Sequence, residues 1–542
     1  MTVIRTLHWY LSRELLKVTG LALIAFTLVM TVFAIVEPLR KQGLSSDQVI
    51  SLFGYTLPVM LSLTLPVAAL FAATIVYGRF SQDNELLACR ASGIATFSLL
   101  KPAIVLGMLV TIASLGLSNF LAPKLARMGA NAVRENVRNI AFHQLRAQGF
   151  IKFGPYIVHA DTVDVDSDML GGVVAADTKN PNEVQLVVAS AAKVRFYERD
   201  GEWYVGFSLA QATGGVANRP DTADMGMVAL GSLPIPSSVI KEKVSVYDWG
   251  QLVRTLNEPY NHPEIQRSLR DIRRRIYHGM VARDVAGVIN LARRPYDKFS
   301  DGRYAYRLVA DVAKLDEHGS VKLHGTQEQR VTVTQFQDGN EVKTFTAGWA
   351  EVQANWSAMS NVSLVTITLM DDVRARLPAE GDQPPRRLGD KHDLGDIKVP
   401  QDVTQRAQEI SLDSIYKCDR PEDLELNHVI YDEITDLRTR GLRVVLGSVI
   451  AEIHGRIAYG VSCFLLVALG AALGLLFRGG QLVSAFAIAA IPAAFVIVMI
   501  IMGKEMTCHP NVPMVWGLTA IWAGIVLLLG ANVCVYAYLM RR

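Results

Sequence analysis

A short charged segment, residues 81–93, joins two long apolar stretches and carries regularly placed ionisable side chains. Asp83 and Glu85 fall where a helix would begin and Arg90 near where it would end, and a helix dipole favours anions and cations at these two ends. Ser81 or Asp83 can cap the first turn. Such a charged rim is suited to ion pairs with another protein, although the same pattern fits any amphipathic connector.

Three basic residues stand at the ends of apolar stretches. Arg40 and Lys41 follow the first stretch, and Lys504 ends the fifth. Placed at one edge of a membrane, these side chains could donate charge-assisted hydrogen bonds to a lipid phosphate, and Arg40 could donate two at once. The alternative is that they only anchor the helix ends by extending their charged groups towards water. The sequence leaves both interpretations open.

Motifs for enzymatic chemistry are absent from the sequence. It has no G-x-x-x-x-G-K-[ST] phosphate loop, because its Gly503-Lys504 pair is followed by Glu505, and it has no H-E-x-x-H or G-x-S-x-G. The five cysteines form no C-x-x-C pair, and a net charge of +3 without a basic, aromatic-rich run does not favour nucleic-acid binding. We therefore expect no enzymatic activity, no catalytic residue, no metal, no cofactor and no nucleic-acid partner.

The apolar residues are concentrated towards the two ends of the chain. Half of all residues are hydrophobic and 19% are charged, but the middle of the chain has the composition of a soluble protein. A helix rises about 1.5 Å per residue, so about 20 apolar residues cross a bilayer core of about 30 Å. Six stretches meet this length: 15–36, 52–78, 99–122, 457–477, 482–503 and 514–540.

Basic residues near the ends of these stretches predict their orientation, because cytoplasmic loops of membrane proteins are enriched in Lys and Arg. With the N-terminus inside, nine basic residues lie at cytoplasmic ends and only Arg40, Lys41 and Lys504 at outer ends. Both termini and segment 81–93 are then cytoplasmic, and the long middle segment is not. The nine residues are Arg5, Arg13, Lys17, Arg79, Arg90, Lys101, Arg478, Arg541 and Arg542.

The middle segment, 123–450, has the pattern of a β domain. Short alternating segments separated by Gly, Asp and Asn fill residues 150–215 and again 303–373. Many short antiparallel strands favour a sandwich or jellyroll. Between the two sets, residues 263–294 are predicted to form an arginine-rich helix. Residues 377–405, rich in Pro, Gly and charge, are predicted to be a linker or a surface excursion.

These elements together predict the fold class. It is an α-helical membrane protein with three spans in residues 1–122 and three in residues 451–542, and with an all-β domain of the jellyroll or sandwich type inserted between the two halves.

Several motifs lie at the ends of the apolar stretches. They are Pro58 with Pro66, Gly78-Arg79-Phe80-Ser81-Gln82-Asp83-Asn84-Glu85-Leu86, Arg90-Ala91-Ser92-Gly93-Ile94, Asn119-Phe120-Leu121-Ala122-Pro123 and Glu452-Ile453-His454-Gly455-Arg456. With these motifs the chain resembles the lipopolysaccharide-export permease family (LptF/LptG) over about 1–125 and 405–542. The resemblance implies three spans, a periplasmic β-jellyroll-like domain and three further spans in the bacterial inner membrane.

The same resemblance implies a function and partners. Two paired permeases, this chain and a second homologous one, would extract lipopolysaccharide or a related glycolipid and pass it to periplasmic bridge proteins. A dimeric cytoplasmic ABC ATPase would drive them. Glu85, with Asp83 and Arg90 nearby, would belong to a coupling helix seated in a groove of the ATPase, and the first and fifth spans would border a lateral gate for lipid.

Two other functions stay open at this point. The middle segment is much longer than the family usually carries, which leaves room for a permease that exports another envelope lipid or client. The second alternative is a membrane-anchored scaffold whose β domain only binds envelope partners. A scaffold needs one or two anchors, so the two three-span halves count against it.

Overall fold

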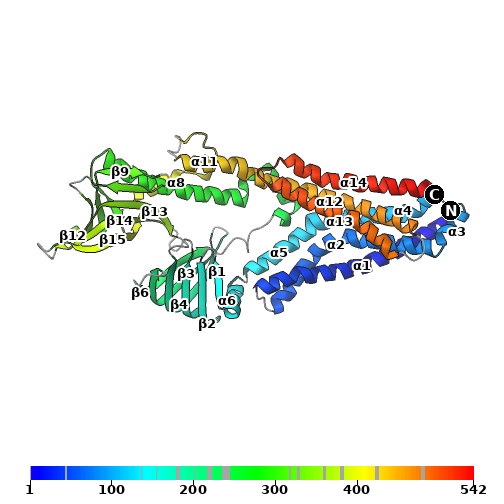
Figure 1. Cartoon of the computed structure of the whole chain (residues 1–542), viewed down its shortest axis with the longest axis horizontal. Coiled ribbons are helices and arrows are strands. Elements are labelled where there is room, and N and C mark those ends of the chain that lie inside the picture. The colour runs from blue at the N-terminus through cyan, green and yellow to red at the C-terminus, as the bar shows by residue number, and fades with distance from the viewer. Residues whose placement is uncertain are drawn as a thin grey trace.

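The molecule is elongated, with a bundle of long helices at one end and two β-sheets extending from it (Figure 1). Both chain termini lie at the end of the bundle far from the sheets, which we call the terminal end; the opposite end is the sheet end. The computed structural model describes residues 2–42, 46–135, 137–153, 156–178, 184–199, 202–216, 222–234, 244–316, 319–325, 330–357, 362–378, 384–421, 427–477 and 482–541.

Six helical stretches in these residues are long and apolar enough to span a membrane, which confirms the six predicted spans. They are Arg5–Ala34, Val59–Gln82, Thr96–Met128, His428–Leu476, Phe486–Cys508 and Met514–Arg541. Four of them lie within α1 (Thr2–Gln42), α2 (Ser46–Gln82), α13 (Leu482–Cys508) and α14 (Met514–Arg541). The third runs through α4 (Thr96–Gly116) and the π-helical turn η1 (Leu117–Leu121) into α5 (Ala122–Glu135), and the fourth through α11 (His428–Asp436) and the π-helical turn η6 (Leu437–Gly441) into α12 (Leu442–Leu476).

Helix α12 is the centre of the bundle. It packs against α2 and α4 of the first half and against α13 and α14 of the second. A Cβ on Gly474 would lie 2.7 Å from the carbonyl oxygen of Thr74, and a Cβ on Gly470 would lie 2.9 Å from that of Leu70, both on α2. Small residues at such positions let two helix backbones approach closely. The two halves of the chain are therefore joined along the contact between α2 and α12.

The predicted helix 81–93 is shorter in the structure. It is α3, Glu85–Ala91, and it ends as predicted with Gly93 in the left-handed region at φ +78°. The expected cap is wrong: Asn84 is the N-cap residue, at φ +58° and without a side-chain cap. The reason is that α2 continues to Gln82, so that Ser81 is buried and donates to the carbonyl oxygen of Leu475 on α12 at 3.1 Å.

The first sheet follows the third span through α5 (Ala122–Glu135) and α6 (Val137–Gln148). Its strands are antiparallel and pair in sequence order from β1 to β6. Val158, Ala192 and Phe207 on its buried face form one core with Phe142 of α6. The strands are β1 (Phe150–Phe153), β2 (Tyr156–Asp164), β3 (Met169–Asp177), β4 (Gln185–Arg199), β5 (Glu202–Val216) and β6 (Thr222–Pro234).

The second sheet has the strand order β12-β11-β8-β7-β15-β14-β13-β10-β9, and β12 also pairs with β14, so that part of it closes like a barrel. Its core is separate and includes Val285 of α8 with Val321 and Leu369 of the sheet. The predicted inserted β region is thus confirmed and contains two sheets. The strands are β7 (Tyr296–Ser300), β8 (Ala305–Val309), β9 (Val312–Leu315), β10 (Val321–His324), β11 (Val331–Gln337), β12 (Asn340–Ala347), β13 (Trp349–Ser357), β14 (Val362–Arg376) and β15 (Arg386–Lys398).

Helix α8, Pro263–Asn290, stands where an arginine-rich helix was predicted and runs beside α11 towards the second sheet (Figure 1). Leu269 and Ile272 are buried against Ile415 of α10 and Ile434 of α11. The remaining elements are η2 (Val244–Val246), α7 (Trp249–Asn257), η3 (Pro259–Asn261), α9 (Gln401–Glu409), α10 (Leu412–Tyr416), α11 (His428–Asp436) and the π-helical turn η6 (Leu437–Gly441).

The linker predicted over 377–405 is wrong for the described residues 384–405. They form strand β15, which pairs with β14, and the start of α9. The composition resembles a linker because most side chains of β15 are exposed and charged, and Arg387 pairs with Asp372 on the neighbouring strand at 3.2 Å. Among the described side chains of β15 only Ile397 is buried, and one apolar position is too little signal to predict a strand.

Candidate functional site

A cavity of about 330 Å³ lies at the sheet end of the bundle. Its walls come from α2, η1, α5, η2, α12 and α13, so both halves of the chain and the segment before α7 build it. The lining is Val59, Ser62, Leu63, Ser118, Ala122, Pro123, Ala126, Ser245, Val246, Glu452, Gly455, Arg456, Tyr459, Ile497, Ile500, Ile501 and Lys504.

Three ionisable side chains of the lining form one network. Glu452 and Arg456 are four residues apart on α12, and neighbours at this spacing face each other on a helix. Glu452 accepts from Nε of Arg456 at 2.8 Å and from Nζ of Lys504 on α13 at 2.7 Å. A Cβ on Gly455 would lie 2.4 Å from Cε of Lys504, so glycine is needed for the lysine to reach across. One carboxylate faces two cations, which leaves this wall of the cavity positive.

Arg456 is the most buried member of the network, with 5% of its side chain exposed against 12% for Glu452 and 31% for Lys504. Burial of a charge requires that its donors are used. Nη1 of Arg456 contacts Oδ1 of Asn119 at 3.4 Å, and Nη2 donates to the carbonyl oxygens of Ser245 and Tyr247 at 3.0 and 2.9 Å.

Residues 244–257, which we call the strap, consist of η2, Tyr247, Asp248 and α7. Tyr247 and Leu252 are buried against Val449 of α12. Asp248 begins α7 with a capping box, in which its carboxylate accepts from the Gln251 backbone at 2.8 Å. The sequence D-x-x-Q is a signal for such a cap, although the residues before it show no periodicity from which the strap could be predicted.

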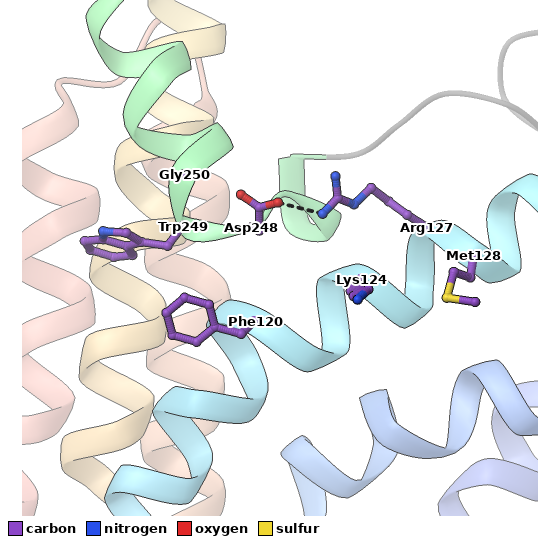
Figure 2. Close-up of a pocket in the computed structure, with 7 residues that line it drawn as sticks. All are labelled: Phe120, Lys124, Arg127, Met128, Asp248, Trp249 and Gly250. Carbon is purple, nitrogen blue, oxygen red and sulfur yellow. Dashed lines mark hydrogen bonds and ion pairs between the residues drawn. The ribbon is translucent and has the colours of Figure 1, made fainter.

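The strap has a second hollow, of about 560 Å³, on its other side (Figure 2). Phe120 and Trp249 form apolar parts of its rim and are 66% and 37% exposed. Lys124 and Arg127 are one turn apart on α5, and Arg127 pairs with Asp248 at 2.6 Å, as the dashed line in Figure 2 marks. Ser245 and Val246 line the cavity while Asp248, Trp249 and Gly250 line the hollow, so the strap separates the two spaces.

The Asp248 carboxylate is ionised in this arrangement. Burial alone would raise its pKa, but the hydrogen bonds from the Gln251 amide and the Arg127 guanidinium outweigh burial and hold the pKa below the ordinary value. A carboxylate that keeps its charge keeps its ion pair with Arg127. The outer side of the strap is therefore fixed electrostatically to α5.

The predicted ionisable residues of the 81–93 segment lie at the terminal end of the bundle, beside both termini (Figure 1). Asp83 is exposed, whereas Glu85 and Arg90 are half-buried. Nε of Arg90 donates to Oγ1 of Thr96 at 3.1 Å, so part of its role is to join α3 to α4. Leu86 is buried and Leu87 is 55% exposed, which leaves α3 with both charged and apolar surface towards solvent.

Among the three predicted outer cations, one has a described side chain. Lys504 lies in the cavity, paired with Glu452. Arg40 and Lys41 belong to the last turn of α1, and their side chains lie outside the described residues. Arg456 was not predicted as a site residue; the signal was a Glu and an Arg four positions apart at the start of a charge-free stretch.

Two comparisons with known proteins bear on this arrangement. The family model described as lipopolysaccharide export system permease LptF/LptG matches residues 9–205 and 311–541. No curated protein sequence matches the chain. The family match includes all six spans and α3, and it leaves out residues 206–310, which contain β6, the strap and α8. With most of its length matched, this chain belongs to the LptF/LptG family of lipopolysaccharide export permeases.

Proposed function

We propose that this chain works in the bacterial inner membrane as the transport subunit of an ATP-driven exporter, which extracts lipopolysaccharide or a related glycolipid and passes it towards the sheets. The observation that carries the proposal is the cavity at the sheet end, where apolar walls meet a network with one more cation than anion. An amphiphile with acyl chains and phosphates complements both parts.

The acyl chains would lie against the apolar part of the wall, such as Leu63 of α2 and Ile501 of α13, and a phosphate would accept from Lys504. Lys504 is the most exposed cation of the network, so it can reach a phosphate without leaving Glu452. Arg40 and Lys41 are proposed to bind the head group at the same end of the membrane. Their position at the end of α1 supports this role.

Lipid would enter between α1 and α13. The ring of Phe71 on α2 contacts Phe26 of α1 edge-on at 5.7 Å and Phe486 of α13 edge-on at 5.0 Å. Edge-to-face aromatic pairs are worth about 0.5–1.5 kcal/mol each, so these contacts can open at modest cost. A lateral gate at this seam is consistent with the low burial of α1 and α13 within this single chain.

The energy would come from a cytoplasmic ABC ATPase dimer that grips α3, with Glu85 in the groove and Asp83 and Arg90 on the rim. We also propose a second homologous permease chain and periplasmic bridge proteins as partners. The half-buried Glu85 can form a partly desolvated ion pair, which is worth about 1–3 kcal/mol. Glu85→Arg should therefore reduce ATPase co-purification at least tenfold, while Glu14→Arg, on α1, serves as the charge-matched control. Equal recovery of the ATPase with both variants would contradict the role of Glu85.

The cargo is tested by photo-crosslinking in cells. A photoreactive residue in place of Ile501, in the cavity, should yield at least ten times more lipopolysaccharide adduct than one in place of Val526, which is 65% exposed on α14. Equal adducts at both positions would show that lipid contacts the chain only as bulk membrane. An adduct with a different envelope lipid at position 501 would favour the alternative that residues 206–310 adapt the permease to another cargo.

A further inference from the structure

The strap stands between two spaces that both suit an anionic lipid. On one side is the cavity with Arg456 and Lys504, and on the other is the hollow with Lys124 and Arg127 on α5, the helix that leads to the first sheet. The strap lies in the part of the chain that the family model leaves out, whereas the residues that hold it are in the part that it matches. The strap thus lies between the two matched segments, and the bundle residues that hold it lie within them.

Arginines of α12 and α5 hold the strap to the bundle. Nη2 of Arg456 donates to the Ser245 and Tyr247 carbonyl oxygens, and Arg127 pairs with Asp248. Both strap acceptors at Arg456 are neutral carbonyls. A phosphate oxygen is charged, and a phosphate can form a bidentate ion pair with a guanidinium, which neutral carbonyls cannot.

The charge around Arg456 favours such an exchange. Its only carboxylate partner, Glu452, is shared with Lys504, so the network as a whole keeps one positive charge among the described residues. In the buried setting of Arg456, where water screens little, an anion gains more from that excess than it would at the surface. A phosphate in the cavity is thus a better partner for Nη2 than the strap is.

We propose that the strap is a lid between the cavity and the hollow, latched on Arg456 and released when a phosphate of the cargo lipid replaces the two carbonyls. The lid also covers Arg127, which pairs with Asp248 of the strap. When the strap moves, Asp248 leaves that guanidinium, and Arg127 becomes free to bind a phosphate. Release then opens a path along four cations, in the order Lys504, Arg456, Lys124 and Arg127, from the cavity towards the first sheet. This proposal rests on the proposed function, since it needs an anionic glycolipid in the cavity.

Hydrogen–deuterium exchange of the full chain in lipid nanodiscs tests the lid. The peptide 244–257 contains the Tyr247 and Leu252 amides, which donate to the carbonyls of Val244 and Asp248 at 3.1 and 3.0 Å. Nanodiscs with lipopolysaccharide should speed exchange in this peptide at least tenfold over nanodiscs of neutral phospholipid. Lipopolysaccharide stripped of its phosphates should leave it unchanged. The α8 segment 265–276, whose apolar face is buried, is the internal control, and its exchange should not change with any lipid.

Variants separate the latch from the cargo. Arg456→Gln should give fast exchange in the strap without any lipopolysaccharide, and Asp248→Asn, which leaves the bundle network intact, should raise exchange about threefold. Slow exchange in a folded Arg456→Gln protein would overturn the latch, and if that variant does not fold, slow exchange in Arg456→Lys, which keeps the charge but loses Nη2, would do so. If the adduct at position 501 forms while lipopolysaccharide leaves the strap as slow as before, the lid is refuted and the proposed function stands. If no adduct forms at 501, the proposed function fails, and the variants still decide whether Arg456 holds the strap.

Discussion

Replacing Glu452 with Gln tests whether the cavity network behaves as a buried set of charges. The carboxylate accepts from Arg456 at 2.8 Å and from Lys504 at 2.7 Å, and the glutamine amide keeps the volume but has only one acceptor oxygen. Its NH₂ group must then face one of the two cations. Arg456 loses its counter-charge while its side chain is 5% exposed, which is the condition under which a buried ion is most costly.

The expected loss of stability in Glu452→Gln follows from that burial. Breaking a buried ion pair by removing one partner costs about 3–5 kcal/mol, and since the 31%-exposed Lys504 can be partly rescued by water, we expect the lower end, about 3 kcal/mol. In Glu452→Gln/Lys504→Met the Lys504 ammonium, which has lost its carboxylate partner, is removed as well. About 1 kcal/mol of stability should then be recovered, because the two sites are in contact and their effects are not additive.

The assay is unfolding of the purified chain in mixed micelles by titration with a denaturing detergent, followed by tryptophan fluorescence. Nε1 of Trp522 on α14 donates to Nδ1 of His454 on α12 at 3.2 Å, so a tryptophan reports on the helix that carries the network. Glu505→Gln is the matched control, because Glu505 is exposed next to Lys504 and its loss should change stability by less than about 0.5 kcal/mol. If Glu452→Gln lowers the free energy of unfolding by less than about 1 kcal/mol and no more than the control does, the view that these charges are buried and interdependent is refuted.

Two further predictions use the same unfolding measurement. Gly474→Ala should lower the free energy of unfolding by about 1–3 kcal/mol, because its Cβ would lie 2.7 Å from the Thr74 carbonyl oxygen. Gly530→Ala, whose Cβ would have no atom within 4 Å, should not destabilise the protein. Equal effects of the two changes would show that α2 and α12 are not closely packed at Gly474. Burial, with Arg274 nearby, lowers the pKa of His278 from 6.5 to about 4 in the folded protein, so the unfolded chain binds the proton first and stability falls as pH drops from about 6.5 towards 4. Between pH 7 and 4.5 the native protein should lose about 2 kcal/mol more than His278→Gln, and identical pH profiles would contradict this.

The spans were predictable because a lipid-facing helix needs apolar side chains over its whole length. The resulting run of about 20 apolar residues is much longer than any turn or loop requires. The end of α3 was predictable for a similar reason, since Gly93 adopts a backbone angle that favours glycine. Its start was not, because Ser81 and Asp83 carry the same cap signal whether or not the preceding helix continues past them. What decided the outcome was the contact of Ser81 with α12, which lies far away in the sequence.

The candidate site was only partly predictable. Lys504 was identified from its place at the end of an apolar stretch, but its partner Glu452 lies on another helix, and sequence spacing does not reveal contacts between helices. Arg456 shows the same limit, because two of its acceptors are backbone carbonyls of the strap, and every residue has a carbonyl. Strand β15 was mistaken for a linker since its stabilising contacts are pairing with β14 and surface ion pairs, neither of which needs apolar residues.

The central position of α12 has a consequence for how the protein is made. Of the six spans, α12 is the fourth to be synthesised, after both sheets, yet it is the main partner of α2. The first sheet pairs each strand with its sequence neighbour and can form as soon as it emerges, because local contacts close quickly. Among the first three spans, α1 can pack on α2 at once, but the surface of α2 that contacts Gly470 and Gly474 has no partner in the membrane until α12 is made. Biogenesis therefore passes through a half-bundle with a finished sheet attached, and this half-bundle is the stage at which insertion factors and quality-control proteases meet an incomplete chain.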